Sequence, residues 1–307
     1  MIKYIIPDSG QISAVNDFLF DCMHTYPEWF YDDFKLDAAY GLIKNTIWTA
    51  GRAMYDKYII SLAQIEEVIS GYQSEGMTYR FVFSNRFLEK EDLYDYWGNA
   101  CLKIGEKYNS GVIVASDLLA NYIHEKYPKI HLVSSVTKGV LNDEQRKTIF
   151  ENPMYKLLVV NTHYNHNLEE TVPVEYRKKA EILINDCCPP NCPFHQRCYD
   201  DNSMLAKGQE RNGSRTCKNN NRPKNSYFHV ENEWIKENCE NLTVEEVREL
   251  HKKGFEYFKI NGRSFDEVVN ISAYADYLVK PEFRDKFICD AMFDLFVKKR
   301  VKQEWRS

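Results

Sequence analysis

Eight short apolar or β-branched runs alternate with helical patterns along most of this 307-residue chain. Such alternation is the pattern of a parallel sheet wound with helices. We expect strands at Lys3–Ile6, Leu36–Tyr40, Tyr79–Ser84, Val112–Ala115, Ile130–Ser134, Leu157–Asn161, Ile182–Asn185 and Tyr257–Ile260, with helices between them such as 62–71, 90–107, 118–127 and 244–253. Eight strands predict a (β/α)8 barrel, closed or, because the first two strands are weakly patterned, partly open.

The length of the chain allows one large barrel or two domains, and the strand count leads us to expect one barrel domain over residues 1–307. Residues 265–307 are expected to form helices that close the barrel. About forty residues separate the seventh strand from the next helical pattern, which is far above the usual connection length. We therefore expect an inserted, cysteine-bearing loop at 186–230.

The overall composition is that of an ordinary soluble protein, with 44% hydrophobic residues and a net charge of −5. A net charge of this sign and size gives no reason to expect nucleic-acid binding. The first apolar run is cut off by Pro7 and Asp8, and no segment approaches the roughly 20 apolar residues that span a bilayer. We expect a cytoplasmic protein with no membrane partner, in which nine cysteines favour metal or redox chemistry over disulfides.

The cysteines after the seventh strand have the spacing of metal ligands. They are Cys188, Cys192, Cys198 and Cys217, with Cys187 and Cys239 as further candidates. Four thiolates suit either a [4Fe-4S] cluster or a structural Zn²⁺. The spacing matches neither the common ferredoxin run nor a zinc ribbon, so it predicts a metal without deciding which one. The alternative is that these cysteines are small buried hydrophobes, which their crowding in a polar loop disfavours.

Two charged residues are expected inside the barrel, because alternate strand residues face the interior. Phe258 and Ile260 share one face of the last strand, which turns Lys259 inward. Glu181 shares a face with Asn185 in the neighbouring strand and is placed to neutralise Lys259. We expect these two residues, with Arg263, to be catalytic; the alternative for Lys259 and Glu181 is a structural ion pair.

Polar residues also follow the ends of the strands, where barrels of this class place their active sites. The candidates for substrate binding are Asn85, Ser134, Ser135, Asn161, Asn185 and Arg52. Any one of them can instead bond loop backbone groups. Arg263 is the best anchor for an anion, since a guanidinium binds carboxylate or phosphate in a bidentate manner. The basic cysteine loop, 204–224, is a candidate contact for RNA phosphates or a solvated surface.

The chain resembles the peptidase U32-like family over most of its length. The resemblance rests on residues 111–138, on KLLVVN ending at Asn161, on EILINDCCPPNCPF ending at Phe194, and on FKINGR from Phe258 to Arg263. It implies a TIM-barrel-like fold and a [4Fe-4S] cluster held by four cysteines. Cys188, Cys192 and Cys217 match family cysteines, whereas Cys198 stands where many relatives have His. The Gly-x-Cys signature of the larger members is absent.

The resemblance implies an iron–sulfur redox enzyme, or one of oxygen-independent hydroxylation, acting on RNA or on a small biosynthetic intermediate. The expected partners are the small-molecule or RNA substrate and, as an open alternative, an electron donor or partner protein. One alternative is a non-redox binding protein in which a structural zinc ion holds the long loop in place. The other is a peptidase, as the family name suggests. The sequence has neither an H-E-x-x-H nor a G-x-S-x-G motif of known hydrolases.

Overall fold

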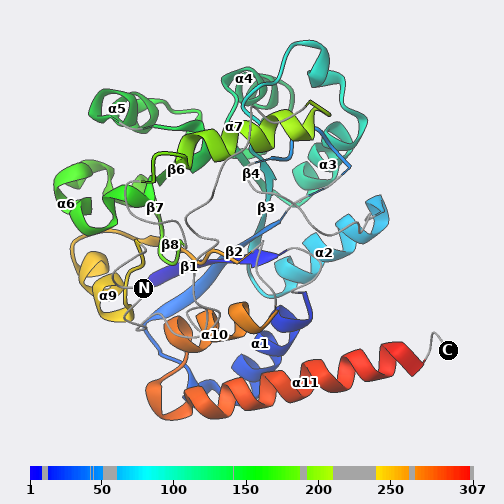
Figure 1. The fold of residues 1–307 in the computed structure, drawn as a ribbon, viewed down its shortest axis with the longest axis vertical. Helices are drawn as coiled ribbons and strands as arrows, with labels where there is room; N and C mark the ends of the chain where they lie inside the picture. The colour runs from blue at the N-terminus through cyan, green and yellow to red at the C-terminus, as the bar shows by residue number, and fades with distance from the viewer. Residues whose placement is uncertain are drawn as a thin grey trace.

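The protein is a closed barrel of eight parallel strands in chain order, seen in a computed structural model (Figure 1). The structure describes residues 1–8, 13–41, 43, 45–50, 61–140, 142–186, 192–209, 240–262 and 267–304, with side chains to 297. The strands are β1 (Ile2–Asp8), β2 (Phe34–Gly41), β3 (Thr78–Phe83), β4 (Gly111–Val114), β5 (His131–Ser134), β6 (Tyr155–Val160), β7 (Ala180–Leu183) and β8 (Tyr257–Lys259). All eight predicted strands are confirmed, and β1 pairs with β8 to close the barrel.

Helices surround the barrel, and most of them lie against its outer face. They are α1 (Ser13–Thr25), α2 (Leu62–Ser74), α3 (Tyr96–Lys107), α4 (Asp117–Lys126), α5 (Asp143–Glu151), α6 (Leu168–Thr171), α7 (His195–Ala206), α9 (Val244–Lys252), α10 (Glu267–Leu278) and α11 (Arg284–Glu304). Local sequence sets several helix starts: Ser61 and Thr243 each form a capping box, with Gln64 and Glu246 respectively. Among the described residues, no helix is both long and apolar enough to cross a membrane.

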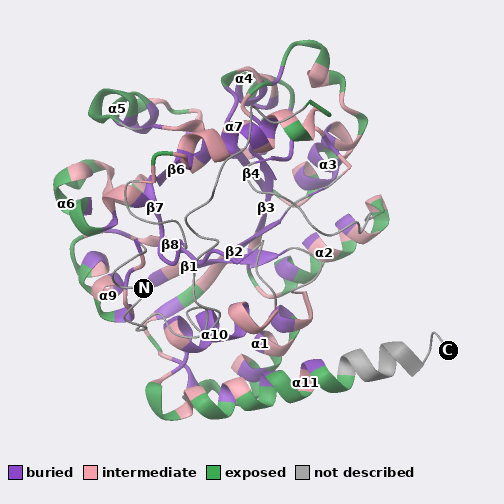
Figure 2. Cartoon of the chain, viewed as in Figure 1, coloured by how far each residue is buried: buried purple, intermediate pink, exposed green. Residues whose placement is uncertain are grey.

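Two layers of buried side chains hold the fold together. The outer layer fills the space between strands and helices, and the strands are buried throughout most of their length (Figure 2). The inner layer is a smaller apolar cluster inside the barrel, made of Ile5, Ala38, Tyr40, Val82, Ile113, Val133, Leu157 and Val159. It comes from every second residue of the strands, as the period of a β-strand requires.

Two of the strands carry one extra residue. The pairing of β1 with β2 skips Asp37, and the pairing of β5 with β6 skips Lys156. Such bulges bend a strand and re-aim its side chains, and they recur at barrel rims. In this barrel each bulge places a charged residue in the amino-terminal half of its strand.

The segment expected to be an inserted loop is partly helical. Helix α7 lies within it, and residues 187–191 and 210–239 fall outside the described part of the chain. The helix crosses the carboxyl ends of the strands: Ser203 contacts the end of β3, Gln196 the loop after β5, and His195 the loop after β6. It therefore covers the face of the barrel where the sequence predicted the site.

Candidate functional site

An ion pair between two strands lies inside the barrel. Nζ of Lys259 in β8 is 3.4 Å from Oε1 of Glu181 in β7, and both side chains are buried. The strands are neighbours, and Lys259 pairs with Leu183, which is the next residue after Glu181 on the same face of β7. The contact is the one expected from strand alternation.

A third buried charge, Arg80 of β3, was not predicted. Its Nη1 donates to the other carboxylate oxygen of Glu181, and its Nη2 lies 3.6 Å from a carboxylate oxygen of Asp37. The side chain of Arg80 is fully buried, and its Nε has no hydrogen-bond partner among the described residues. One carboxylate is thus shared by two cations. Strand alternation could have predicted this residue from the sequence, because Arg80 lies on the same strand face as Val82, which points inward.

A small pocket opens above this cluster, on the carboxyl side of the barrel. Lys259 lines it together with other polar side chains from the strand ends and from α7: Ser135, Thr137, Asn261, Tyr40 and Tyr199. Its apolar walls are Val82, Ile113, Val136, Val159 and Leu183. The volume is about 30 Å³, enough for about one or two water molecules. The pocket therefore offers one buried ammonium group among apolar and aromatic walls.

Tyr40 helps to hold the ammonium group of Lys259. The Nζ atom sits 4.0 Å from the centre of the Tyr40 ring, a distance at which the ring face attracts a cation. The Tyr40 hydroxyl donates to the carbonyl of Ile260 at 2.8 Å, which fixes the ring against the end of β8. Glu181 and Tyr40 together hold Lys259 between them at the base of the pocket.

Helix α7 closes the pocket from above through a cluster of aromatic rings. The Tyr199 hydroxyl is 3.0 Å from Nε2 of His195, and the His195 ring packs 4.8 Å from that of His163. Burial lowers the pKa of His163, and its Nε2 has no hydrogen-bond partner among the described residues. The His163 ring is therefore favoured in its neutral form beside the pocket.

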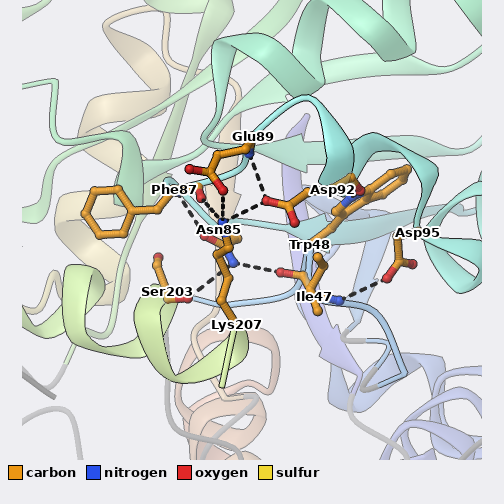
Figure 3. A network of polar contacts seen from close by, with 9 residues as sticks. All are labelled: Ile47, Trp48, Asn85, Phe87, Glu89, Asp92, Asp95, Ser203 and Lys207. Atoms are coloured by element: carbon orange, nitrogen blue, oxygen red, sulfur yellow. Dashed lines mark hydrogen bonds and ion pairs between the residues drawn. The ribbon is translucent and has the colours of Figure 1, made fainter. Parts of the chain in front are cut away.

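Among the candidate substrate-binding residues that the structure describes, Ser135 alone lines the pocket. The other candidates fall into three groups. In the first group, the Asn85 side chain donates to the backbone carbonyls of Ile47 and Ser203 (Figure 3). The Asn185 side chain donates to the backbone carbonyl of Asn261 at 2.9 Å. These contacts are the structural use that strand-end amides commonly have.

Ser134 and Asn161 form the second group, buried at strand ends without lining the pocket. Ser134 is fully buried, and its hydroxyl has no partner in the described part of the chain. Asn161 caps the following helical turn by accepting from the His163 amide, while its Nδ2 lacks a described partner. Arg52 and Arg263 form the third group, which lies outside the described residues.

Two of the four predicted cysteine ligands are described. Cys192 lies three residues before the start of α7, and Cys198 lies in its first turn. Both are partly exposed and neither forms a disulfide. Cys188 and Cys217, with the alternatives Cys187 and Cys239, lie outside the described residues. Within residues 192–209 and the other described ranges, no group of three metal-ligating side chains comes together. The described half of the predicted ligand set stands at the barrel mouth.

Other cysteines of the chain differ from this pair in their surroundings. Burial raises the pKa of the Cys22 thiol to about 11 and that of Cys101 to about 12. Both therefore stay protonated at neutral pH and behave as small apolar side chains, as their helical positions suggested.

Comparison with known proteins adds one structural likeness. No protein-family model matches the chain, and no curated protein matches it. The structure of the U32 peptidase Mk0906 is similar to this one, with a TM-score of 0.50 and 16% sequence identity over 85% of this chain and 93% of that one. The chain therefore has the barrel fold of a U32 peptidase, as the sequence resemblance predicts.

Proposed function

We propose that this chain is a U32-like iron–sulfur protein that carries out a redox or oxygen-independent hydroxylation reaction on RNA or a small biosynthetic intermediate. The observation that supports it best is the position of α7. Cys192 and Cys198 flank the start of this helix, and the adjacent residue Tyr199 lines the pocket above Lys259. A ligand set and a polar pocket thus belong to one helix at the end of the barrel where such folds carry their sites.

The donor chemistry of the described cysteines fits a cluster. Metal-bound cysteines are thiolates, and four such thiolates form the usual ligand shell of a [4Fe-4S] cluster. Cys192 and Cys198 are partly exposed, unlike Cys22 and Cys101. We propose Cys188 and Cys217 as the other two ligands. A bound [4Fe-4S] cluster would supply one-electron transfer at this end of the barrel.

The protein's own side chains define what a ligand in the pocket meets. The Lys259 ammonium can donate a hydrogen bond to a carbonyl or carboxylate oxygen, while Glu181 and Tyr40 hold its position. The apolar walls lower the local dielectric constant, which strengthens that interaction. We propose Arg263 and Arg52 as further contacts for an anionic group of the substrate, with an electron donor or partner protein completing the reaction.

The described part of the basic segment offers little to RNA. Lys207 already forms ion pairs with Glu89 at 3.0 Å and with Asp92 at 2.9 Å. These pairs tie the end of α7 to the loop after β3 (Figure 3). A small intermediate is therefore the substrate that the described residues favour, and RNA remains the second candidate.

Cysteine variants test the ligand assignment. Cys192→Ser and Cys198→Ser are expected to lose iron and acid-labile sulfide after anaerobic purification, because serine is a poor ligand for the cluster. The matched control is Cys289→Ser, which changes an exposed cysteine of α11 and should leave the iron content unchanged. Equal iron in all three variants would contradict the assignment.

The two alternatives predict different measurements. A zinc-stapled binding protein would be colourless and carry zinc, and Cys192→Ser would disorder the 186–230 segment without changing a redox signal. A peptidase would cleave unstructured protein substrates after complete removal of metal and after Cys188→Ser. Either result would replace the iron–sulfur proposal.

A further inference from the structure

Three inward-facing residues form a row across neighbouring strands at the amino-terminal end of the barrel. Arg80 of β3 pairs with Gly111 of β4, and Gly111 pairs with His131 of β5. A side chain at position 111 would place its Cβ only 2.4 Å from Nε2 of His131. Because residue 111 is glycine, the imidazole of His131 can lie across β4, toward the strand that carries Arg80.

The two side chains of this row keep nitrogen atoms without a hydrogen-bond partner among the described residues. They are Nε and Nη2 of Arg80 and Nε2 of His131, and all three atoms are buried. Nη2 of Arg80 lies 3.6 Å from a carboxylate oxygen of Asp37, which is beyond hydrogen-bond distance. Buried donors of a guanidinium normally have acceptors, so these nitrogens are available to an acceptor that enters the barrel mouth.

Lys156 of β6 adds a positive charge beside this row. The bulge after Tyr155 puts Lys156 next to the start of β5, where His131 lies. Although the Lys156 side chain reaches the surface, loss of hydration lowers its pKa, and the charge of Arg80 acts in the same direction. Burial, and then the charges of Lys156 and Arg80, likewise lower the pKa of His131. The three groups are therefore within electrostatic reach of one another.

The cations of this region outnumber its carboxylates. Among the described residues, Lys156 takes part in no ion pair, whereas Lys3 pairs with Glu256 at 2.6 Å and adds no net charge. The remaining group contains four cations and two carboxylates, which leaves two positive charges uncompensated: Lys35, Arg80, Lys156 and Lys259 against Asp37 and Glu181. Like charges near a protein interior repel because water screens them little, so an anion with two negative charges would stabilise the group.

We propose that a phosphate group binds at the amino-terminal mouth of the barrel, between Lys156, His131 and Arg80. Phosphate carries about two negative charges near neutral pH, and its oxygens accept hydrogen bonds from several donors. The exposed Lys156 and the partly exposed His131 leave the site open to solvent. The site lies at the opposite end of the barrel from the pocket and α7, so it does not rest on the proposed function.

Titration calorimetry of the full chain with inorganic phosphate, at pH 7 and constant ionic strength, tests the site. We expect saturable binding, and Lys156→Met should weaken it about tenfold, the factor typical of a hydrogen bond to a charged group. Lys90→Met is the matched control, since it removes an exposed lysine after β3, at the other end of the barrel. No saturable binding to the wild type, or equal affinity in Lys156→Met, would overturn the proposal.

The same titration with adenosine monophosphate identifies the source of the phosphate group. Tighter binding of this monoester would assign the site to phosphorylated metabolites, and tighter binding of inorganic phosphate would assign it to the free ion. Either result supports a phosphate site.

Asp37→Asn tests the charge balance with an effect of the opposite sign. Asp37 competes with the anion for Arg80, so its neutralisation should tighten phosphate binding about threefold. This variant gives its own answer even if Lys156→Met fails to fold. Weaker or unchanged phosphate binding in Asp37→Asn would contradict the proposal.

Discussion

Lys259 and Arg80 bind the two oxygens of a single buried carboxylate, Glu181, from opposite sides. Removing that carboxylate leaves two cations buried without their common partner. We expect Glu181→Gln to lower the free energy of unfolding by about 3–5 kcal/mol, the cost of an uncompensated buried charge. The loss is measured by urea denaturation followed by circular dichroism.

Lys259→Met tests the same cluster from the other side. Glu181 keeps Arg80 as its partner in this variant, so the expected loss of stability is within about 1.5 kcal/mol. If Lys259 binds substrate, this variant folds but loses turnover. The exposed pair of Lys252 and Glu249 provides a control, since Lys252→Met should leave the urea midpoint unchanged. Equal losses for Glu181→Gln and Lys259→Met would show that the carboxylate is not shared.

The partly buried imidazole of His131 predicts how stability depends on pH. Burial lowers its pKa to about 3, and the charges of Lys156 and Arg80 act in the same direction, against Asp37. In the unfolded chain the pKa is about 6.5, so the unfolded state alone binds the proton between these values. The contribution of His131 is therefore complete above pH 6.5 and is lost as the pH falls toward 3, by up to about 1.4 kcal/mol per pH unit.

The measurement compares the wild type with His131→Asn at two pH values. Between pH 7 and pH 5 the wild type should lose up to about 2 kcal/mol more stability than the variant. Carboxylates that titrate in the same range contribute equally to both proteins and cancel in the difference. Identical losses would mean that His131 is protonated in the native protein.

Asn85 is expected to hold α7 over the pocket. Its side chain bonds the carbonyls of Ile47 and Ser203 and accepts from the Phe87 amide. Asn85→Ala leaves these buried groups unpaired, at a cost of about 1–3 kcal/mol. Hydrogen exchange should accelerate in residues 195–206. Ser134→Ala is the control, because the Ser134 hydroxyl has no partner among the described residues. If exchange in residues 195–206 were also faster in Ser134→Ala, α7 would respond to any change at the rim and not to the loss of the Asn85 contacts.

The strands could be predicted because burial dominates their sequence. Each is a run of apolar or β-branched residues, such as Gly111–Val114, in which every residue is buried. The bulges at Asp37 and Lys156 could not, since a charged residue near the start of a strand fits an ordinary position of regular pairing equally well. Helix α7 was missed for a related reason: the residues that it buries against the barrel mouth, among them His195, Tyr199 and Ser203, are polar and give no apolar period.

The inward positions of two charged residues could be predicted, because alternation along a strand determines which side chains face the interior. This rule predicts that Lys259 and Glu181 face inward. It applies equally to Arg80, which could have been identified as a third charged residue inside the barrel. The rim was harder to predict, because a strand-end amide such as Asn185 fits a substrate contact and a backbone contact equally well. Only the conformation of the neighbouring loop decides between the two, and that conformation depends on contacts far along the chain.

The central claim is that the cysteines around α7 hold an iron–sulfur cluster. Its most direct test is the iron, sulfide and zinc content of the full chain purified without oxygen, together with its visible absorbance. A [4Fe-4S] cluster predicts about four iron and four sulfide per chain and a brown protein. A colourless protein that carries zinc, with no iron or sulfide, would contradict the claim.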